Sequence, residues 1–171
     1  NAGLVPPWSW MNAPEEGGGR IVCEECHFFD YCTWLIGSAP ISVSAAAVSY
    51  QGNQFVGSDN LSSVVKYADG STATIVYCTM GDAALGKERV EVFAGGRVAV
   101  LEDFASVTVY GGKDRGWSGS SDKGHRAYVA AVGKAMSEGS DLPVPIEAAY
   151  LAHRLTFKAM ESARTGAIVA C

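Results

Sequence analysis

A cysteine- and histidine-rich segment near the start of the chain contains side chains that could do chemistry. Cys23-Glu24-Glu25-Cys26-His27 matches C-x-x-C-H, the pattern for covalent attachment of c-type haem. With Cys32, these residues also supply the four nitrogen or sulfur ligands of a structural zinc site. Haem attachment is disfavoured because the motif lies inside a predicted helix beside a strand-rich segment. Zinc is disfavoured because on one helix Cys26 and His27 point about 100° apart. Buried thiols that pack as small hydrophobic side chains are the favoured interpretation, and we assign no metal-ligating residue.

His27 is the strongest candidate for proton transfer. An unperturbed imidazole has a pKa near 6.5, so histidine is the side chain best suited to take a proton from a hydroxyl at neutral pH. On a helix, His27 shares a face with Asp30 and Cys23, and a nearby carboxylate could hold its tautomer. The competing interpretation is a structural histidine on a helix surface.

The elements that must position His27 are a helix over Arg20–Ile36 and two C-terminal helices. Residues 20–36 contain no glycine or proline, and Gly37 is a typical helix end. Within this helix we expect a core stripe of Ile21, Phe28, Cys32 and Leu35. Further helices are predicted over Asp122–Ser137 and Ile146–Thr165.

The segment between these helices has strand character. Strands are predicted over residues 41–48, 62–67, 72–79, 89–93, 97–101 and 106–110, with a tight hairpin at Asp69-Gly70. Residues 111–121 are predicted to form a loop. Strands joined by hairpins make an antiparallel sheet. We therefore predict an α+β fold, a mostly antiparallel open sheet of about five to seven strands with helices packed on one face.

Composition limits the class of protein. The 171 residues, 48% of them hydrophobic, are enough for one globular domain with its own core. The 13 basic and 18 acidic residues give a net charge of −5, which argues against binding nucleic acid. No apolar run is long enough for a transmembrane helix. Five cysteines, an odd number, favour reduced thiols, and we expect a cytoplasmic protein. Because the chain begins at Asn1, we interpret it as a piece of a longer protein.

Several motifs together resemble the C-terminal domain of the Gfo/Idh/MocA oxidoreductases, the family of glucose-fructose oxidoreductase and inositol dehydrogenases. Residues 17–30, GGGRIVCEECHFFD, are similar to the family pattern G-G-G-x-L-x-D-x-G-x-H-x-x-D. The other matches follow in the family's order and span nearly the whole chain: Asp69-Gly70-Ser71, residues 87–93 (KERVEVF), 101–104 (LEDF) and 122–125 (DKGH). The residues within these motifs are most similar to those of the branch in which this module forms the end of a two-part dehydrogenase.

The resemblance implies an NAD(P)-dependent oxidoreductase that acts on a hydroxyl or ketone of a sugar, sugar nucleotide or cyclitol. Residues 1–171 would form a single substrate-binding and oligomerisation domain. The cofactor, NAD or NADP, would be bound mainly by a preceding Rossmann domain, so no cofactor-binding residue is assigned here and the fragment alone is expected to be inactive. The implied partners are that domain and further copies of the chain, through the sheet, in a homodimer or larger homo-oligomer. The implied catalytic residues are His27 and Glu24, and the implied substrate-binding residues are Asp30, Arg20, Lys87 and Arg89.

Two departures from the family pattern leave alternatives open. The family's Asp falls on Cys23, and Glu25 stands where the pattern has Gly. The carboxylate role could have moved to Glu24, which lies next to Cys23 but on another helical face. Alternatively, this branch works without that carboxylate, or its activity is weakened. The alternative function is a noncatalytic binding or assembly module with a drifted active site.

Overall fold

The computed structural model describes residues 1–3, 5–6, 8–49, 51–52, 55–56, 59–113 and 115–171. Its contacts divide the chain into two compact units. Unit 1 comprises Asn1–Gly3 and Gly81–Pro143, and unit 2 comprises Leu4–Met80 and Val144–Cys171. Among the described residues no helix is long and apolar enough to cross a membrane.

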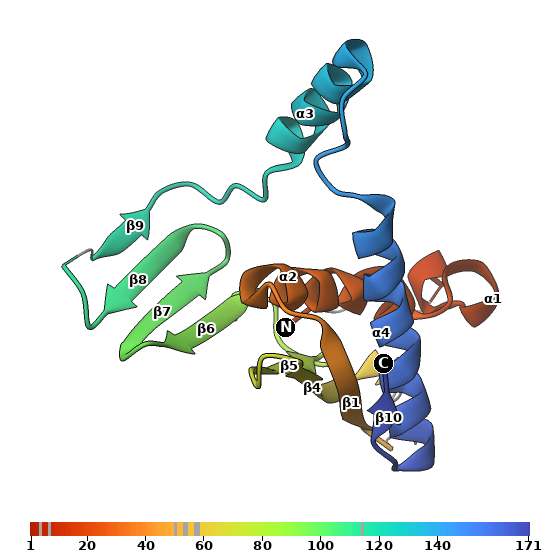
Figure 1. Cartoon of the computed structure of the whole chain (residues 1–171). Coiled ribbons are helices and arrows are strands. Elements are labelled where there is room, and N and C mark those ends of the chain that lie inside the picture. Colours follow the sequence, from red (N-terminus) through yellow and green to blue (C-terminus); the bar gives the residue numbers. More distant parts are fainter. Residues whose placement is uncertain (4, 7, 50, 53–54, 57–58, 114) are drawn as a thin grey trace. The chain divides into compact units, whose positions relative to one another are not determined.

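Unit 2 is built on a four-stranded antiparallel sheet in the order β10-β1-β4-β5 (Figure 1). Its strands are β1 (Pro40–Ala47), β4 (Leu61–Tyr67), β5 (Thr72–Tyr77) and β10 (Val169–Ala170). A two-stranded ribbon, β2 (Gln51–Gly52) and β3 (Phe55–Val56), lies between β1 and β4 in the sequence. The N-terminal segment adds η1 (Trp10–Asn12) and α1 (Pro14–Gly17).

Two helices cover one face of this sheet. The helix α4 (Ile146–Thr165) packs along β1, and α2 (Cys26–Ile36) contacts both α4 and β5. Strict alternation of buried and exposed residues along β4 shows why one face is covered, because successive side chains point to opposite faces. The core is made of apolar side chains from the covered face and from the two helices: Val43, Leu61, Val65, Tyr67, Ile75, Phe29, Leu155 and Ala159.

Unit 1 contains a second four-stranded antiparallel sheet, in the order β6-β7-β8-β9. Its strands are β6 (Arg89–Ala94), β7 (Arg97–Glu102), β8 (Ser106–Tyr110) and β9 (Gly116–Ser118). Gly95 and Gly96 both have positive φ, which the tight turn between β6 and β7 requires. Unit 1 also contains the helix α3 (His125–Glu138).

The predicted α+β class with antiparallel strands is confirmed, and the six predicted strands divide between the two four-stranded sheets. The break falls in residues 78–88, which join β5 to β6 and contain no strand. Strand β9 lies within the segment predicted as a loop. Its three residues, Gly116-Trp117-Ser118, carry no alternating pattern from which a strand could be predicted. The predicted helix over residues 146–165 is confirmed at both ends, and Gly166 closes it with a left-handed backbone.

The predicted helix over residues 20–36 contains a turn that the sequence did not indicate. Residues Ile21–Glu25 form a π-helical segment, η2, which runs directly into α2. A π-helical turn pairs residues five apart, so it holds about one residue more than an α-helical turn. The buried face of the following helix α2 is therefore shifted by one residue toward the C-terminus. Phe29 is fully buried where the predicted stripe had Phe28, which is half-buried like Cys32. Leu35 is exposed, so the predicted stripe was wrong at this position.

Candidate functional site

The glycine triplet sets the backbone that enters η2. Gly18 and Gly19 have φ values of 74° and 86°, a left-handed conformation that favours glycine. A Cβ atom on Gly19 would lie 3.3 Å from Oδ1 of Asp59, the residue that precedes β4 by two positions. The Asp59 carboxylate accepts a hydrogen bond from the backbone N–H of Arg20, while burial raises its pKa. The triplet thus lets the chain pass closely over Asp59 and start the turn.

A partly buried ion pair crosses the π-helical turn. Arg20, which is 2% exposed, donates from Nη2 to Oε2 of Glu24 over 3.0 Å, and the Glu24 side chain is 27% exposed. The same Glu24 oxygen accepts a short hydrogen bond from the hydroxyl of Tyr77 at the end of β5. The Arg20 guanidinium carbon also lies 5.9 Å from the centre of the Tyr77 ring. Burial, followed by the bond to Glu24, raises the pKa of Tyr77.

Because Arg20 and Tyr77 share one carboxylate oxygen, Glu24 is fixed on the side of the turn that faces β5. Among the described residues no hydrogen bond reaches Oε1 of Glu24. That oxygen remains available to a ligand hydroxyl group.

Glu25, the last residue of η2, points into the core. It is 0% exposed, and its Oε1 accepts a hydrogen bond from the hydroxyl of Ser63 on β4 over 3.4 Å. Burial raises the pKa of Glu25 to about 8, against a smaller lowering by the Ser63 hydrogen bond. At neutral pH this side chain is therefore mostly an uncharged carboxylic acid.

His27 is the second residue of α2 and is exposed. In the described part of the chain no hydrogen bond or ion pair joins its imidazole to another group. Asp30 lies one turn further along α2 and is partly exposed. One continuous helical segment thus carries the candidates Arg20, Glu24, His27 and Asp30. Arg20 and Glu24 form an ion pair, His27 is exposed and Asp30 is partly exposed.

Lys87 and Arg89 belong to unit 1 and are exposed. Lys87 offers its carbonyl oxygen to the ammonium group of Asn1 over 3.0 Å. Arg89 is 59% exposed and forms ion pairs with Glu91, at 2.7 Å, and with Glu102 across the β6–β7 pair.

The cysteine motif does not form a metal cluster. Among the described residues no group of three or more histidine, cysteine or acidic side chains is arranged to hold a metal ion. All five cysteines are free thiols. Burial raises the pKa of Cys23 and Cys26, and Cys23 is placed to donate a weak hydrogen bond to the carbonyl of Arg20 over 3.8 Å.

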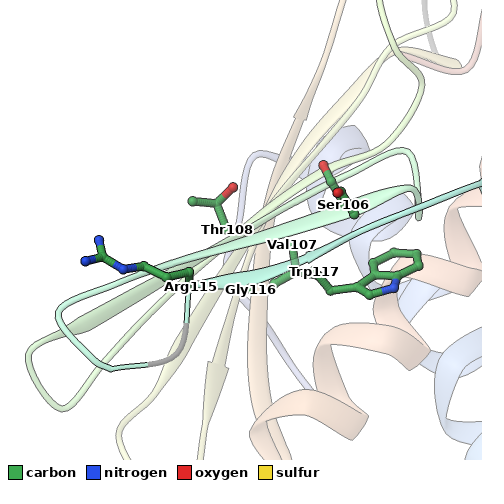
Figure 2. A pocket seen from close by; sticks show the side chains of 7 residues that line it. Ser106, Val107, Thr108, Arg115, Gly116 and Trp117 are labelled. Atoms are coloured by element: carbon green, nitrogen blue, oxygen red, sulfur yellow. The ribbon is translucent and has the colours of Figure 1, made fainter.

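A shallow pocket of about 260 Å³ lies at the β8–β9 pair of unit 1 (Figure 2). Trp117 is paired directly with Val107, whereas Ser106 is paired with Ser118 and Thr108 with Gly116. Because paired residues share a face, the indole of Trp117 lies on the face opposite to the Ser106 and Thr108 hydroxyls. The pocket therefore does not combine an aromatic platform with hydroxyl groups. It is lined by Ser106, Val107, Thr108, Arg115, Gly116, Trp117 and Ser118.

Comparison with known families identifies the domain. The family model for the oxidoreductase family C-terminal alpha/beta domain, GFO_IDH_MocA_C, matches residues 2–171. The chain belongs to the Gfo/Idh/MocA oxidoreductase family. This confirms the resemblance carried by the glycine triplet, His27 and Asp30. A search of curated proteins found no match.

Solved structures with the same fold are distant in sequence. An aldose-aldose oxidoreductase from Caulobacter crescentus, solved with glycerol, has a TM-score of 0.84 at 15% identity, covering 99% of this chain and 53% of that one. An NAD binding oxidoreductase from Klebsiella pneumoniae has a TM-score of 0.77 at 16% identity, with coverage of 96% and 54%. A UDP-N-acetylglucosamine 3-dehydrogenase from Acidithiobacillus ferrooxidans has a TM-score of 0.71 at 14% identity, with coverage of 83% and 46%. The chain spans about half the length of these structures.

Sequence reasoning missed the residues that hold the Gfo/Idh/MocA motif in place, namely Asp59, Ser63 and Tyr77. Tyr77 and Ser63 lie on the covered face of the sheet, and the period-two pattern of β4 and β5 was a signal for that placement. Their hydrogen bonds to Glu24 and Glu25 depend on the π-helical turn, which no local sequence pattern indicates.

Proposed function

We propose that this chain is the substrate-binding and oligomerisation domain of an NAD(P)-dependent oxidoreductase that acts on a hydroxyl or ketone group of a sugar, sugar nucleotide or cyclitol. The family membership supports the reaction class. The names of the solved relatives, an aldose-aldose oxidoreductase and a UDP-N-acetylglucosamine 3-dehydrogenase, support the substrate class. The observation that carries the proposal is the exposed His27 at the start of α2, directly after a turn fixed by three buried polar contacts.

The chemistry divides between this chain and a nicotinamide cofactor held by a preceding domain. When bound, the cofactor supplies the hydride acceptor or donor. The described residues contain no glycine-rich loop between a strand and a helix that could cradle a pyrophosphate, so they do not fit the dinucleotide itself. This chain therefore contributes the substrate side of the site and the proton transfer.

In the oxidative direction, the His27 imidazole accepts the proton of the reacting hydroxyl as the carbon–hydrogen bond breaks. In the reductive direction, the imidazolium returns that proton to the carbonyl oxygen. Glu24 is the second proposed catalytic residue, because its Oε1 can accept a hydrogen bond from a substrate hydroxyl while Oε2 is held by Arg20 and Tyr77. This assigns to Glu24 the carboxylate role that Cys23 cannot fill.

The proposed substrate contacts differ in kind. Asp30, one turn beyond His27, can accept hydrogen bonds from sugar hydroxyls. Arg20 acts through Glu24, since its guanidinium is buried in the ion pair. Lys87 is an exposed cation of unit 1 and is suited to an anionic group such as a sugar-nucleotide phosphate. Arg89 is also exposed, but it would have to exchange its pairing with Glu91 and Glu102 for such a group.

Assembly through the uncovered face of the unit 2 sheet is the proposed route to a homo-oligomer. That face presents small or β-branched side chains, among them Ser44, Ser62, Val64, Thr74 and Val76, together with the exposed Lys66 of β4. A sheet face with so few charged side chains is suited to pair with a second copy of itself.

The decisive experiment uses the full-length protein with NAD⁺ and NADP⁺ and a panel of aldoses, UDP-sugars and inositols. His27→Ala is expected to lower kcat by about 10²–10⁴-fold, the usual contribution of a general acid or base. His153→Ala, which removes an exposed histidine of α4, is the matched control and should retain activity. Unchanged turnover in His27→Ala overturns the catalytic assignment.

A noncatalytic binding or assembly module is the second candidate. The observation that favours it is the free thiol of Cys23 at the position where the family pattern has Asp. It predicts no turnover with any panel member, together with binding of the same sugars to the full-length protein by calorimetry.

A further inference from the structure

The most unusual group in unit 2 is the buried carboxyl group of Glu25. The residue is 0% exposed, and Ser63 Oγ, at 3.4 Å from Oε1, is the hydrogen-bond partner that the structure gives it. Its other oxygen, Oε2, is buried with no hydrogen-bond partner in the described part of the chain. A carboxylate in this position would be a buried, uncompensated charge, which is strongly unfavourable.

In the described part of the chain no charged group offsets that cost. The charged groups around η2 are Arg20, Glu24 and Asp59, and those on the elements packed against it: His27 and Asp30 of α2, Lys66 of β4, and Glu147, His153, Arg154, Lys158, Glu161 and Arg164 of α4. Arg20 is ion-paired with Glu24, Asp59 accepts a hydrogen bond from the backbone N–H of Arg20, and the rest lie on partly or fully exposed positions. Burial and the Ser63 hydroxyl are the two influences on the pKa of Glu25, which lies at about 8.

The Glu25 side chain also makes one of the contacts that hold the π-helical turn. Asp59 holds its start, Tyr77 holds Glu24, and Ser63 holds Glu25 at its end. π-Helical turns are rare and tend to occur at functional sites. Here the turn fixes where α2 begins, and His27 follows Glu25 by two residues. Loss of the contact at Glu25 would act first on the backbone that carries His27.

We propose that Glu25 is a positioning residue for His27: its uncharged carboxyl group can stay buried at the end of the π-helical turn, and loss of its proton at alkaline pH draws the charged carboxylate toward solvent, releases the turn and displaces the start of α2. The functional consequence rests on the proposed role of His27, whereas the structural change does not. The device makes the site sensitive to pH through a residue that does not touch the substrate.

The test follows the His27 side chain by NMR in full-length protein labelled at histidine, with its resonance assigned by loss in His27→Gln. The wild-type resonance is expected to show a transition at about pH 8, where Glu25 loses its proton. Glu25→Gln replaces the acid with an uncharged group of the same shape and is expected to abolish that transition. Glu16→Gln, an exposed glutamate of α1, is the matched control and should retain it. An identical transition in wild type and Glu25→Gln, or none in wild type, overturns the proposal.

Infrared spectra and the pH dependence of kcat give two further tests of the role of Glu25. If Glu25→Gln fails to fold, infrared spectra of the wild type decide the point, because a carboxylic-acid C=O band should be present at pH 7 and lost as the pH rises through 8; its absence at pH 7 overturns the proposal. With active enzyme, kcat should fall about tenfold per pH unit above 8 in the wild type, and Glu25→Gln should remove this fall without changing KM. If His27→Ala retains turnover, the proposed function fails, and the resonance and infrared transitions still decide the role of Glu25.

Discussion

The hydroxyl group of Tyr77 donates a hydrogen bond to Oε2 of Glu24 and thereby ties the end of β5 to the π-helical turn. Tyr77 is 4% exposed, so the bond is made in a largely dry environment. Strand β5 thus fixes the carboxylate of Glu24, which lies three residues before His27 in the sequence. The position of the candidate site depends on this contact between two segments that lie 53 residues apart.

Tyr77→Phe should lower the free energy of unfolding by about 1–3 kcal/mol, because it leaves a carboxylate oxygen without one of its donors and keeps the ring. Tyr150→Phe, at an exposed position of α4, is the control and should change stability by less than about 0.5 kcal/mol. Urea unfolding followed by circular dichroism measures both variants. Equal stability of Tyr77→Phe and wild type would contradict the structural importance of this bond.

Arg20→Ala should be more damaging than Arg89→Ala, although both remove an arginine from ion pairs with glutamate. Arg20 is buried, so its loss leaves Glu24 with an uncompensated charge and should cost about 3 kcal/mol. Arg89 is exposed and screened by water, and surface ion pairs of this kind typically contribute about 0–1 kcal/mol. Denaturant midpoints of the two variants test the difference, and a similar shift in both would show that burial of Arg20 does not matter.

The sequence was a good guide where local patterns decide the structure and a poor one where tertiary contacts do. The long amphipathic helix ending before Gly166 was predicted to the residue, and the alternation of β4 matched its burial. The π-helical turn could not be predicted, because its supports are Asp59, Ser63 and Tyr77, all more than 30 residues away in the sequence. The one-residue shift of the buried face, from Phe28 to Phe29, follows from that single turn.

In the candidate site, too, local sequence patterns were a good guide and tertiary contacts could not be predicted. His27 and Asp30 were found because they belong to a local motif at fixed spacing. The positions of Glu24 and Glu25 were not evident, since neighbouring glutamates of one turn face opposite environments: Glu24 toward Tyr77 and partly toward solvent, Glu25 into the core. Only the contacts made by the sheet distinguish them.

Glu25 should make the protein less stable as the pH rises. The pKa of Glu25 is about 8 in the folded state and 4.5 without the fold, so between these values the folded state retains a proton that the unfolded state has lost. The free energy of unfolding should therefore fall with increasing pH, by at most about 1.4 kcal/mol per unit from this group. Glu25→Gln should remove that contribution. Chemical denaturation at pH 5, 6, 7 and 8 measures the slopes, and parallel curves for the two proteins would contradict the prediction.

Gly19→Ala should destabilise unit 2, whereas Gly133→Ala should stabilise α3. Gly19 has a φ of 86°, where an alanine is strained, and its Cβ would press on Asp59, the residue that holds the start of the π-helical turn. The expected loss is about 1–3 kcal/mol. Gly133 lies inside α3 with no atom within 4 Å of an added Cβ, so alanine there should gain about 0.5–1 kcal/mol through helix propensity. Thermal unfolding of the two variants gives shifts of opposite sign if the left-handed backbone at Gly19 is required. An unchanged or raised melting temperature in Gly19→Ala would mean that Gly19 serves only as a spacer and that the turn is set by its side-chain contacts.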